Sequence, residues 1–468
     1  MYSVRPNRVY IMDRVLQDPR CVERLQRLLS ALGCTLDHAT PQNGKVNSIG
    51  VPGATVIRDD DLPAVIRQNG WLGDVRQGAS SLTGDPDIVF SSFVWDPAGR
   101  QERLGGDLFK RCLAAHTYFG DCKQNFAHGR TAALLGAAPF HHYEKRADWS
   151  SRQDVVCWSL LDLHSAWGCF HRCAYCQRSS VFVIMLNVEE FLEQVVRLMA
   201  EHPWQKTFRY DVEQDALTLE PEYGACRLLV EHFAGLDDRY LILFSKSANV
   251  DFLLPLAHRG HTIMLWTLSS PWVSRRFEAK TGTTEERLEA ARRCQQAGYP
   301  VRFKFKPIIP TRDWRAEATD TLERLFAAVR PENLSMETVF FDSVKELDDC
   351  LGLDNLDPAA VAAAQAAEKA PWDKAADGQR PFPHAVKEEI YRHYIAEVRR
   401  LSPDTPITLC AESQRMWAAL ADVLGHKPWD FVCNCGPHCI PGLRRIEQVE
   451  GPDAARIVAA RSAAAVPG

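Results

Sequence analysis

Three cysteines stand within eight positions of one segment, WGCFHRCAYCQRSS, residues 167–180. They are Cys169, Cys173 and Cys176, with the spacing C-x3-C-x2-C. Thiolates are soft ligands that suit iron–sulfur clusters or zinc. Structural zinc sites and ferredoxin-type clusters take four protein ligands, whereas this segment offers three. Three ligands on a four-iron cube leave one iron open to a substrate or cofactor. The alternatives are three unrelated cysteines, or a zinc site completed from elsewhere.

A second group of cysteines lies near the C-terminus. The stretch FVCNCGPHC contains Cys433, Cys435 and Cys439, and Cys410 precedes it in the strand-like segment PITLCAES. Together they make four soft ligands, enough for an auxiliary iron–sulfur cluster or a zinc ion, with His438 as a possible fourth ligand in place of Cys410. Alternatively, one thiol donates a hydrogen atom, or all are free thiols around an ordinary turn.

The composition of the chain bears on whether it binds nucleic acid, is secreted or enters a membrane. The chain has 468 residues, a formal net charge of −5 and 15 cysteines. The acidic balance gives no global attraction to nucleic acid, although Lys304 and Lys306 share one face of a basic, aromatic strand. The N-terminus is too polar for a signal peptide, and no apolar run is long enough to span a membrane. We therefore expect a cytoplasmic protein with reduced thiols and no membrane partner.

The pattern of elements predicts the fold that positions these groups. From about residue 155, strand-like and helix-like stretches alternate, as in VVCWSLLDL, VEEFLEQVVRLMAEH and KTFRYDV. Such alternation favours a parallel sheet of right-handed βαβ units, and about six units predict an α/β fold with a partial (β/α)6-type barrel. The predicted division is an N-terminal region with short α/β elements (1–150), the barrel core (151–345), an Ala-rich insertion (346–385), and the last barrel element with a Cys-containing C-terminal extension (386–468).

The ordered segments resemble a known family. The cysteine spacing after the first barrel strand is similar to that of radical S-adenosylmethionine (SAM) enzymes. More narrowly, RVYIMDRVL, CFHRCAYC followed by NVEEFLEQV, FSKSANVDFLL and FEAKTGTTEERLEAARRCQQAGYPV resemble spore photoproduct lyase, in that order. The resemblance is good over 155–345, moderate over 1–30 and poor elsewhere.

The resemblance implies a cofactor and a reaction. A 4Fe-4S cluster would be held by Cys169, Cys173 and Cys176, and SAM would chelate its open iron. One electron, from an external donor such as flavodoxin or ferredoxin, would cleave SAM to methionine and a 5′-deoxyadenosyl radical that abstracts hydrogen from a substrate. The cofactor would generate the radical, and the barrel would orient the reactants and exclude water.

The resemblance also assigns cofactor-binding residues. Lys246 follows the strand YLILFSK, where the family has a SAM-contacting lysine, and the alternative is a solvated surface lysine. Thr267 matches a family serine that contacts the cofactor, or simply fills a strand. Asp215 matches a family aspartate that bonds the ribose or supports the loop. Gln214 beside it replaces a hydroxyl residue of the family.

This chain differs from the resembled family at two positions that take part in the family's reaction. Where the family has a hydrogen-donating cysteine this chain has Val212, and where it has a radical-relaying tyrosine this chain has Gln177. The first hypothesis is therefore a lyase-like radical SAM enzyme with a changed substrate, a small molecule or DNA. The second is a DNA photolesion repair lyase in which Cys410 is the catalytic hydrogen donor. The third is a non-enzymatic Fe–S or zinc protein that binds nucleic acid.

Overall fold

The computed structural model describes most of the chain. The described residues are 4–34, 54–69, 86–95, 140–143, 155–158, 160–176, 181–212, 214–373, 378–426 and 432–444. Gln177 lies outside these residues. The three cysteines of the loop and those of the C-terminal stretch all lie within them.

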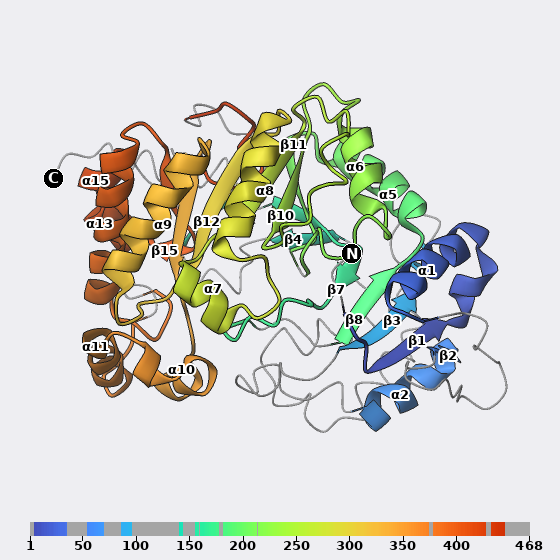
Figure 1. Ribbon diagram of the computed structural model, residues 1–468, viewed down its shortest axis with the longest axis horizontal. Helices are drawn as coiled ribbons and strands as arrows, with labels where there is room; N and C mark the ends of the chain where they lie inside the picture. Colours follow the sequence, from blue (N-terminus) through green and yellow to red (C-terminus); the bar gives the residue numbers. More distant parts are fainter. Residues whose placement is uncertain are drawn as a thin grey trace.

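A curled parallel sheet forms the centre of the molecule (Figure 1). Neighbouring strands pair in parallel, except for β4 at one edge, which pairs antiparallel with β6. The predicted α/β class with a partial β/α barrel is confirmed. In spatial order the strands are β14 (Ile407–Leu409), β13 (Leu334–Thr338), β12 (Val301–Ile308), β11 (Thr262–Thr267), β10 (Tyr240–Ser245), β9 (Thr207–Tyr210), β6 (Leu160–Leu163) and β4 (Phe140–Tyr143).

Helices connect the strands and cover the outer face of this sheet (Figure 1). Strands covered on both faces are buried along their length, and every residue of β11 and β13 is buried. The helix starts carry clear signals, as at Thr283, whose side chain forms a capping box with Glu286. The covering helices are α5 (Val188–Glu201), α6 (Ala225–Phe233), α7 (Pro271–Phe277), α8 (Thr284–Gln296), α9 (Trp314–Ala328) and α13 (His384–Leu401).

The N-terminal region builds a second sheet beside the barrel (Figure 1). Its order is β2 (Ala54–Ile57), β1 (Arg8–Met12), β3 (Asp87–Ser91), β8 (Val181–Met185) and β7 (Ala166–Trp167), with η1 (Asp13–Gln17), α1 (Pro19–Ala31), η3 (Asp59–Asp61) and α2 (Leu62–Asn69) alongside. The sequence pattern predicted a helix directly after the cysteine loop, whereas β8 lies between the loop and α5. This strand, VFVIM, is apolar and β-branched, and it pairs with β3 of the N-terminal region. One contiguous apolar core spans both sheets.

The remaining elements follow β13 and β14. The Ala-rich stretch contributes α10 (Val344–Leu351), η6 (Leu353–Asn355) and α11 (Pro358–Glu368), which bury their own smaller core. Beyond β14, β15 (Glu412–Ser413) pairs antiparallel with β5 (Val155–Val156) and leads into α14 (Gln414–Ala419) and α15 (Ala421–Leu424). Among the described helices, none combines the length and the hydropathy that a membrane crossing requires.

Candidate functional site

The cysteine loop is fixed to the segment that joins α7 to α8. The backbone of Cys173 forms an antiparallel bridge with Glu278, and the N–H of Ala174 donates to the carbonyl of Phe277 at 2.8 Å. Within the loop, the N–H of Cys176 donates to the carbonyl of Cys173 at 2.9 Å. These bonds involve only main-chain atoms. The loop is therefore positioned independently of the cysteine side chains.

The three loop cysteines form no disulfide and differ in exposure. Cys173 is buried, whereas Cys169 and Cys176 are partly exposed. Burial raises the pKa of Cys169 well above its usual value and that of Cys173 to about 12, although nearby Lys246 opposes the second shift. Over the described residues, no group of three His, Cys, Asp or Glu is arranged around a single metal ion. In a four-iron cube each thiolate binds a different iron, so its ligands stand farther apart than the ligands of one ion.

Lys246 lies directly after β10, at the edge of the sheet where the parallel strands end. Its ammonium group donates to the hydroxyl of Tyr175 at 2.8 Å and to the carboxylate of Glu278 at 2.8 Å. The ammonium also lies over the Tyr175 ring, 5.4 Å from its centroid. Because Tyr175 is between Cys173 and Cys176 in the loop, the predicted SAM-binding lysine is brought directly against the cysteine loop.

Glu278 and Arg287 complete this network, and the sequence analysis did not single them out. Glu278 accepts hydrogen bonds from Lys246, Tyr175 and the Arg287 guanidinium. Burial alone would raise the pKa of Glu278, but Arg287 and Lys246 hold it well below its usual range. In sequence, an acidic residue after a short helix and an arginine inside the next helix are typical of a solvent-exposed surface. Only the packing of α8 against the sheet makes them a buried ion pair.

Thr267 ends β11 on the same edge of the sheet. Its carbonyl accepts from Arg287 at 2.9 Å, which ties the strand end to the ion pair. Its hydroxyl is buried and has no hydrogen-bond partner within the described part of the chain. Buried polar atoms are nearly always satisfied, so this hydroxyl fits a polar group of a bound cofactor or a water. The residues at this edge thus fit the cluster and SAM that the resemblance implies.

Asp215 supports the ends of the neighbouring strands. Its carboxylate accepts from Ser245 Oγ at 2.9 Å, from the N–H of Lys246 at 2.6 Å and from the N–H of Leu217 at 3.1 Å. It also lies 2.9 Å from Nε2 of His171 in the cysteine loop. Burial would raise the pKa of Asp215, yet His171 and the backbone donors hold it below its usual value. Asp215 therefore connects the cysteine loop to the end of β10.

Three further predicted residues lie around the same edge. Gln214 donates to Asp211 at 2.6 Å, and its Oε1 has no partner within the described residues. Val212, just beyond β9, is partly exposed. Cys410 follows β14, and Lys306 contacts its sulfur at 3.7 Å. Burial raises the pKa of Cys410 to about 11 although Lys306 opposes the shift, so this thiol keeps its hydrogen at neutral pH.

The C-terminal cysteines lie at the opposite, amino-terminal edge of the sheet. The carbonyl of Pro437 accepts from the N–H groups of Lys206 and Thr207, where β9 begins. A Cβ added at Gly436 would lie 2.8 Å from the sulfur of Cys433 and 2.9 Å from that of Cys439, so these two thiols flank the glycine. The two sulfurs are 3.8 Å apart.

Cys435 points from this segment into the barrel interior. Its sulfur is 3.2 Å from Nζ of Lys304 and 3.5 Å from the Arg209 guanidinium. A hydrogen bond from Cys433 and the two cations hold the pKa of Cys435 well below its usual value despite burial. Cys410, predicted as a fourth ligand, makes no hydrogen bond with these thiols in the described part of the chain. The alternative ligand, His438, packs between Trp158 and Trp204, with ring centroids 6.1 and 6.0 Å away.

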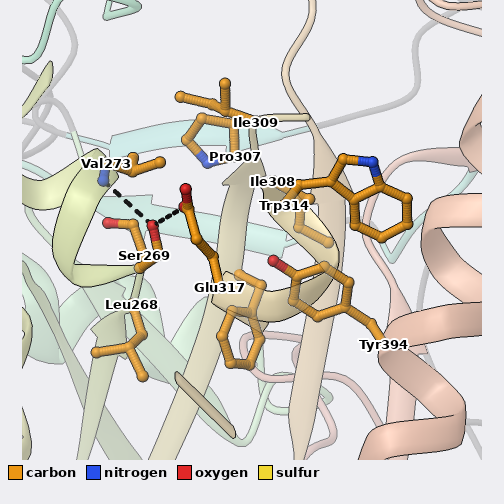
Figure 2. A pocket seen from close by; sticks show the side chains of 11 residues that line it. Leu268, Ser269, Val273, Pro307, Ile308, Ile309, Trp314, Glu317 and Tyr394 are labelled. Carbon is orange, nitrogen blue, oxygen red and sulfur yellow. Dashed lines mark hydrogen bonds between the residues drawn. The ribbon is translucent and has the colours of Figure 1, made fainter. Parts of the chain in front are cut away.

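A small cavity lies outside this network, between the sheet, α7, α9 and α13 (Figure 2). Figure 2 shows the Glu317 carboxylate and the Tyr394 hydroxyl on the lining of this space. Glu317 accepts hydrogen bonds from Ser270 at 2.5 Å and from Thr311 at 2.9 Å. The cavity volume of about 10 Å³ holds about one water, so it does not accommodate an organic substrate.

Comparison with known proteins relates the central segment to one family. Residues 161–346 match the family model described as spore photoproduct lyase. Spore photoproduct lyase from Bacillus subtilis (strain 168) is 29% identical over 182 residues, which cover 37% of this chain and 53% of that protein. The Clostridium acetobutylicum enzyme of the same name is 22% identical over 179 residues, with the same coverage. The chain thus aligns with about half the length of these curated relatives.

A solved structure shows the same fold over a longer stretch. A spore photoproduct lyase double mutant with bound AdoMet and dinucleoside spore photoproduct has a TM-score of 0.54 and 14% sequence identity, covering 87% of this chain and 98% of that chain. A complex of spore photoproduct lyase with the dinucleoside spore photoproduct gives a TM-score of 0.53. Residues 161–346 are thus similar in sequence to spore photoproduct lyase, and most of the chain shares the fold of its solved structures.

Proposed function

We propose that the protein is a radical SAM enzyme whose cluster is held by Cys169, Cys173 and Cys176. When bound, a 4Fe-4S cluster would supply the electron that cleaves SAM into methionine and a 5′-deoxyadenosyl radical. This radical would abstract hydrogen from a substrate. One observation carries the proposal: the backbone bridge at Glu278 holds the loop of three cysteines against Lys246 at the end of β10.

The chain's own residues have distinct tasks in this proposal. Lys246 offers an ammonium group for the carboxylate of SAM, and a lysine at a strand end suits that pairing. Thr267 offers a buried hydroxyl that lacks a partner in the described chain. Asp215 binds the backbone N–H of Lys246 and so fixes where β10 ends. The strands β10 and β11 beneath these residues are largely buried.

Reductive cleavage of SAM tests the proposal directly. Anaerobic reconstitution with iron and sulfide should give a brown protein with about four irons per chain at this site. Addition of dithionite and SAM should then yield 5′-deoxyadenosine, measured by liquid chromatography. A protein that takes up only zinc and yields no 5′-deoxyadenosine would refute the proposal.

The substrate is proposed to differ from that of the related lyases. Val212 stands where the resembled family has its donor cysteine and, unlike a thiol, has no labile hydrogen. Gln177 stands where the family has its relay tyrosine. The radical-forming half of the site is thus retained, while the groups that end the family's reaction are replaced. The proposal is compatible with either a small molecule or DNA as the substrate.

Repair of a DNA photolesion is the second candidate function, and Cys410 favours it. This thiol lies at the end of β14, on the edge that carries Lys246, and stays protonated at neutral pH because burial raises its pKa to about 11. It is the proposed substitute hydrogen donor. Incubation with dinucleoside spore photoproduct should release thymine residues, and Cys410→Ala should stop that release without stopping SAM cleavage. Active SAM cleavage with no lesion turnover would exclude this function.

The C-terminal cysteines are proposed to hold a second iron–sulfur cluster or a zinc ion. The support is their density and the close approach of Cys433 to Cys439. Iron and zinc counts separate the possibilities. An iron count that stays at about four in a Cys433→Ala/Cys435→Ala variant would exclude a second cluster. The described cysteines form no disulfide, which supports the proposed reducing, cytoplasmic location. The proposed electron donor is a flavodoxin or ferredoxin.

A further inference from the structure

Glu278 is a carboxylate shared by two cations beside the cysteine loop. Its side chain is fully buried, and its oxygens contact Lys246 at 2.8 Å and the Arg287 guanidinium. In the described residues, no other carboxylate pairs with either cation. The remaining partners of Arg287 are neutral, namely the carbonyls of Gly282 and Thr267 and the hydroxyls of Ser274 and Thr281.

The charges of this network do not balance. Two cations and one carboxylate leave a surplus of one positive charge in a buried position. Tyr175, the other member, donates its hydroxyl hydrogen to Glu278 and adds no charge. Buried charge is costly unless it is paired, so such a site favours an incoming anion next to the cation that can still reach it. Lys246 keeps 15% side-chain exposure, whereas Arg287 has none.

We propose that Glu278 is a positioning residue for SAM binding: it holds the Lys246 ammonium toward the SAM carboxylate and, through its own backbone, holds that lysine in register with Cys173. The inference rests on the proposed function above. Arg287 neutralises Glu278, so that Lys246 retains its charge for a second carboxylate. The same residue thus connects the loop, the lysine and α8.

The chain contains a matched control for this arrangement. Glu412 is also a buried carboxylate, paired with Lys387 at 3.2 Å and accepting from the Tyr391 hydroxyl at 2.7 Å. This second network shares the glutamate, lysine and tyrosine of the Glu278 network but lies between β15 and α13. Glu412→Gln removes the same charge from the same kind of buried site, so it controls for a general loss of packing.

The test measures SAM affinity in the reconstituted full-length protein by equilibrium dialysis, together with iron content and the steady-state kinetics of SAM cleavage. Glu278→Gln should raise the Kd and KM for SAM about tenfold, as loss of an outer-shell partner does, with iron content retained and kcat at saturating SAM little changed. Glu412→Gln should leave the Kd unchanged.

A double-mutant cycle shows whether Glu278 acts through Lys246. In a Lys246→Ala background, Glu278→Gln should weaken SAM binding by less than about twofold, because its partner is already gone. Equal weakening in both backgrounds, or an unchanged Kd in the single variant, overturns the inference. If Glu278→Gln fails to fold, as judged by circular dichroism, Glu278→Asp replaces it, and an unchanged Kd there also overturns it. Failure of the wild-type chain to bind SAM or iron would instead refute the proposed function.

Discussion

The two cysteine groups of this chain look alike in sequence and differ in their surroundings. Each has three thiols within eight residues. At the loop, the nearby cation Lys246 is held by Glu278. At the C-terminal stretch, the cation Lys304 contacts the sulfur of Cys435 directly. The nearby cation is thus paired with a carboxylate at the loop and with a sulfur at the C-terminal stretch.

The two groups also occupy opposite edges of the same sheet. The loop lies where β10 and β11 end, together with a hydroxyl, that of Thr267, that has no partner in the described chain. The C-terminal stretch lies where β9 begins, and its backbone is bonded to that strand. In β/α barrels the carboxyl ends of the strands carry the active site, and the amino ends contribute stability. We therefore expect loop variants to change chemistry and C-terminal variants to change folding.

Removal of one loop cysteine should give the largest effect. Cys173→Ala should abolish both the iron of the loop site and the formation of 5′-deoxyadenosine, because the cube loses one of three protein ligands. The fold should persist, since the bonds that fix the loop come from its backbone. The matched variant is Cys435→Ser, which should retain SAM cleavage. Loss of SAM cleavage in both variants would contradict the expectation that only the loop cysteines are needed for it.

Loss of the carboxylate at Asp215 should be the next largest effect. Asp215→Asn leaves several buried donors facing an amide, and breaking a buried charged network typically costs about 3–5 kcal/mol. Because the pKa of Asp215 is lowered on folding, its contribution is present above the unfolded value of 3.8 and disappears as the pH falls through the lower folded value. Urea unfolding of the iron-free chain at several pH values measures it. A difference between wild type and variant that grows on acidification would contradict the assignment.

The sequence predicted the loop side of this comparison better than the C-terminal side. The alternation of strands and helices placed Lys246 and Thr267 at strand ends, because parallel strands all end at one edge. The role of Glu278 was not predicted, because its burial arises from the packing of α8 and no local sequence pattern indicates that packing. The strand β8 was missed because its partner, β3, is far away in the chain. Nor did any local pattern show that Cys435 would lie against Lys304.

Crowding of the C-terminal thiols offers a test confined to the other edge. A Cβ at Gly436 would lie 2.8 Å from Cys433 Sγ and from Trp158 Cδ1, closer than side chains pack. Gly436→Ala should therefore lower the free energy of unfolding by about 1–3 kcal/mol, the usual cost of overpacking a core. Chemical denaturation measures the loss, and iron at the loop should be unchanged. A neutral substitution would mean that the C-terminal stretch packs less tightly than its contacts indicate.

The smallest effect should come from a single hydrogen bond that docks the C-terminal stretch. The Thr207 hydroxyl, fully buried at the start of β9, donates to the carbonyl of Gly436. Thr207→Val keeps the branched shape but removes this donor, and one net hydrogen bond is worth about 0.5–1.5 kcal/mol. The cost should stay in that range because Pro437 still accepts from two backbone N–H groups that the substitution does not touch. Unfolding in urea would show it, with SAM affinity as the control readout. A larger loss of unfolding free energy, accompanied by weaker SAM binding, would mean that the two edges of the sheet are coupled. The C-terminal stretch would then affect SAM binding as well as folding.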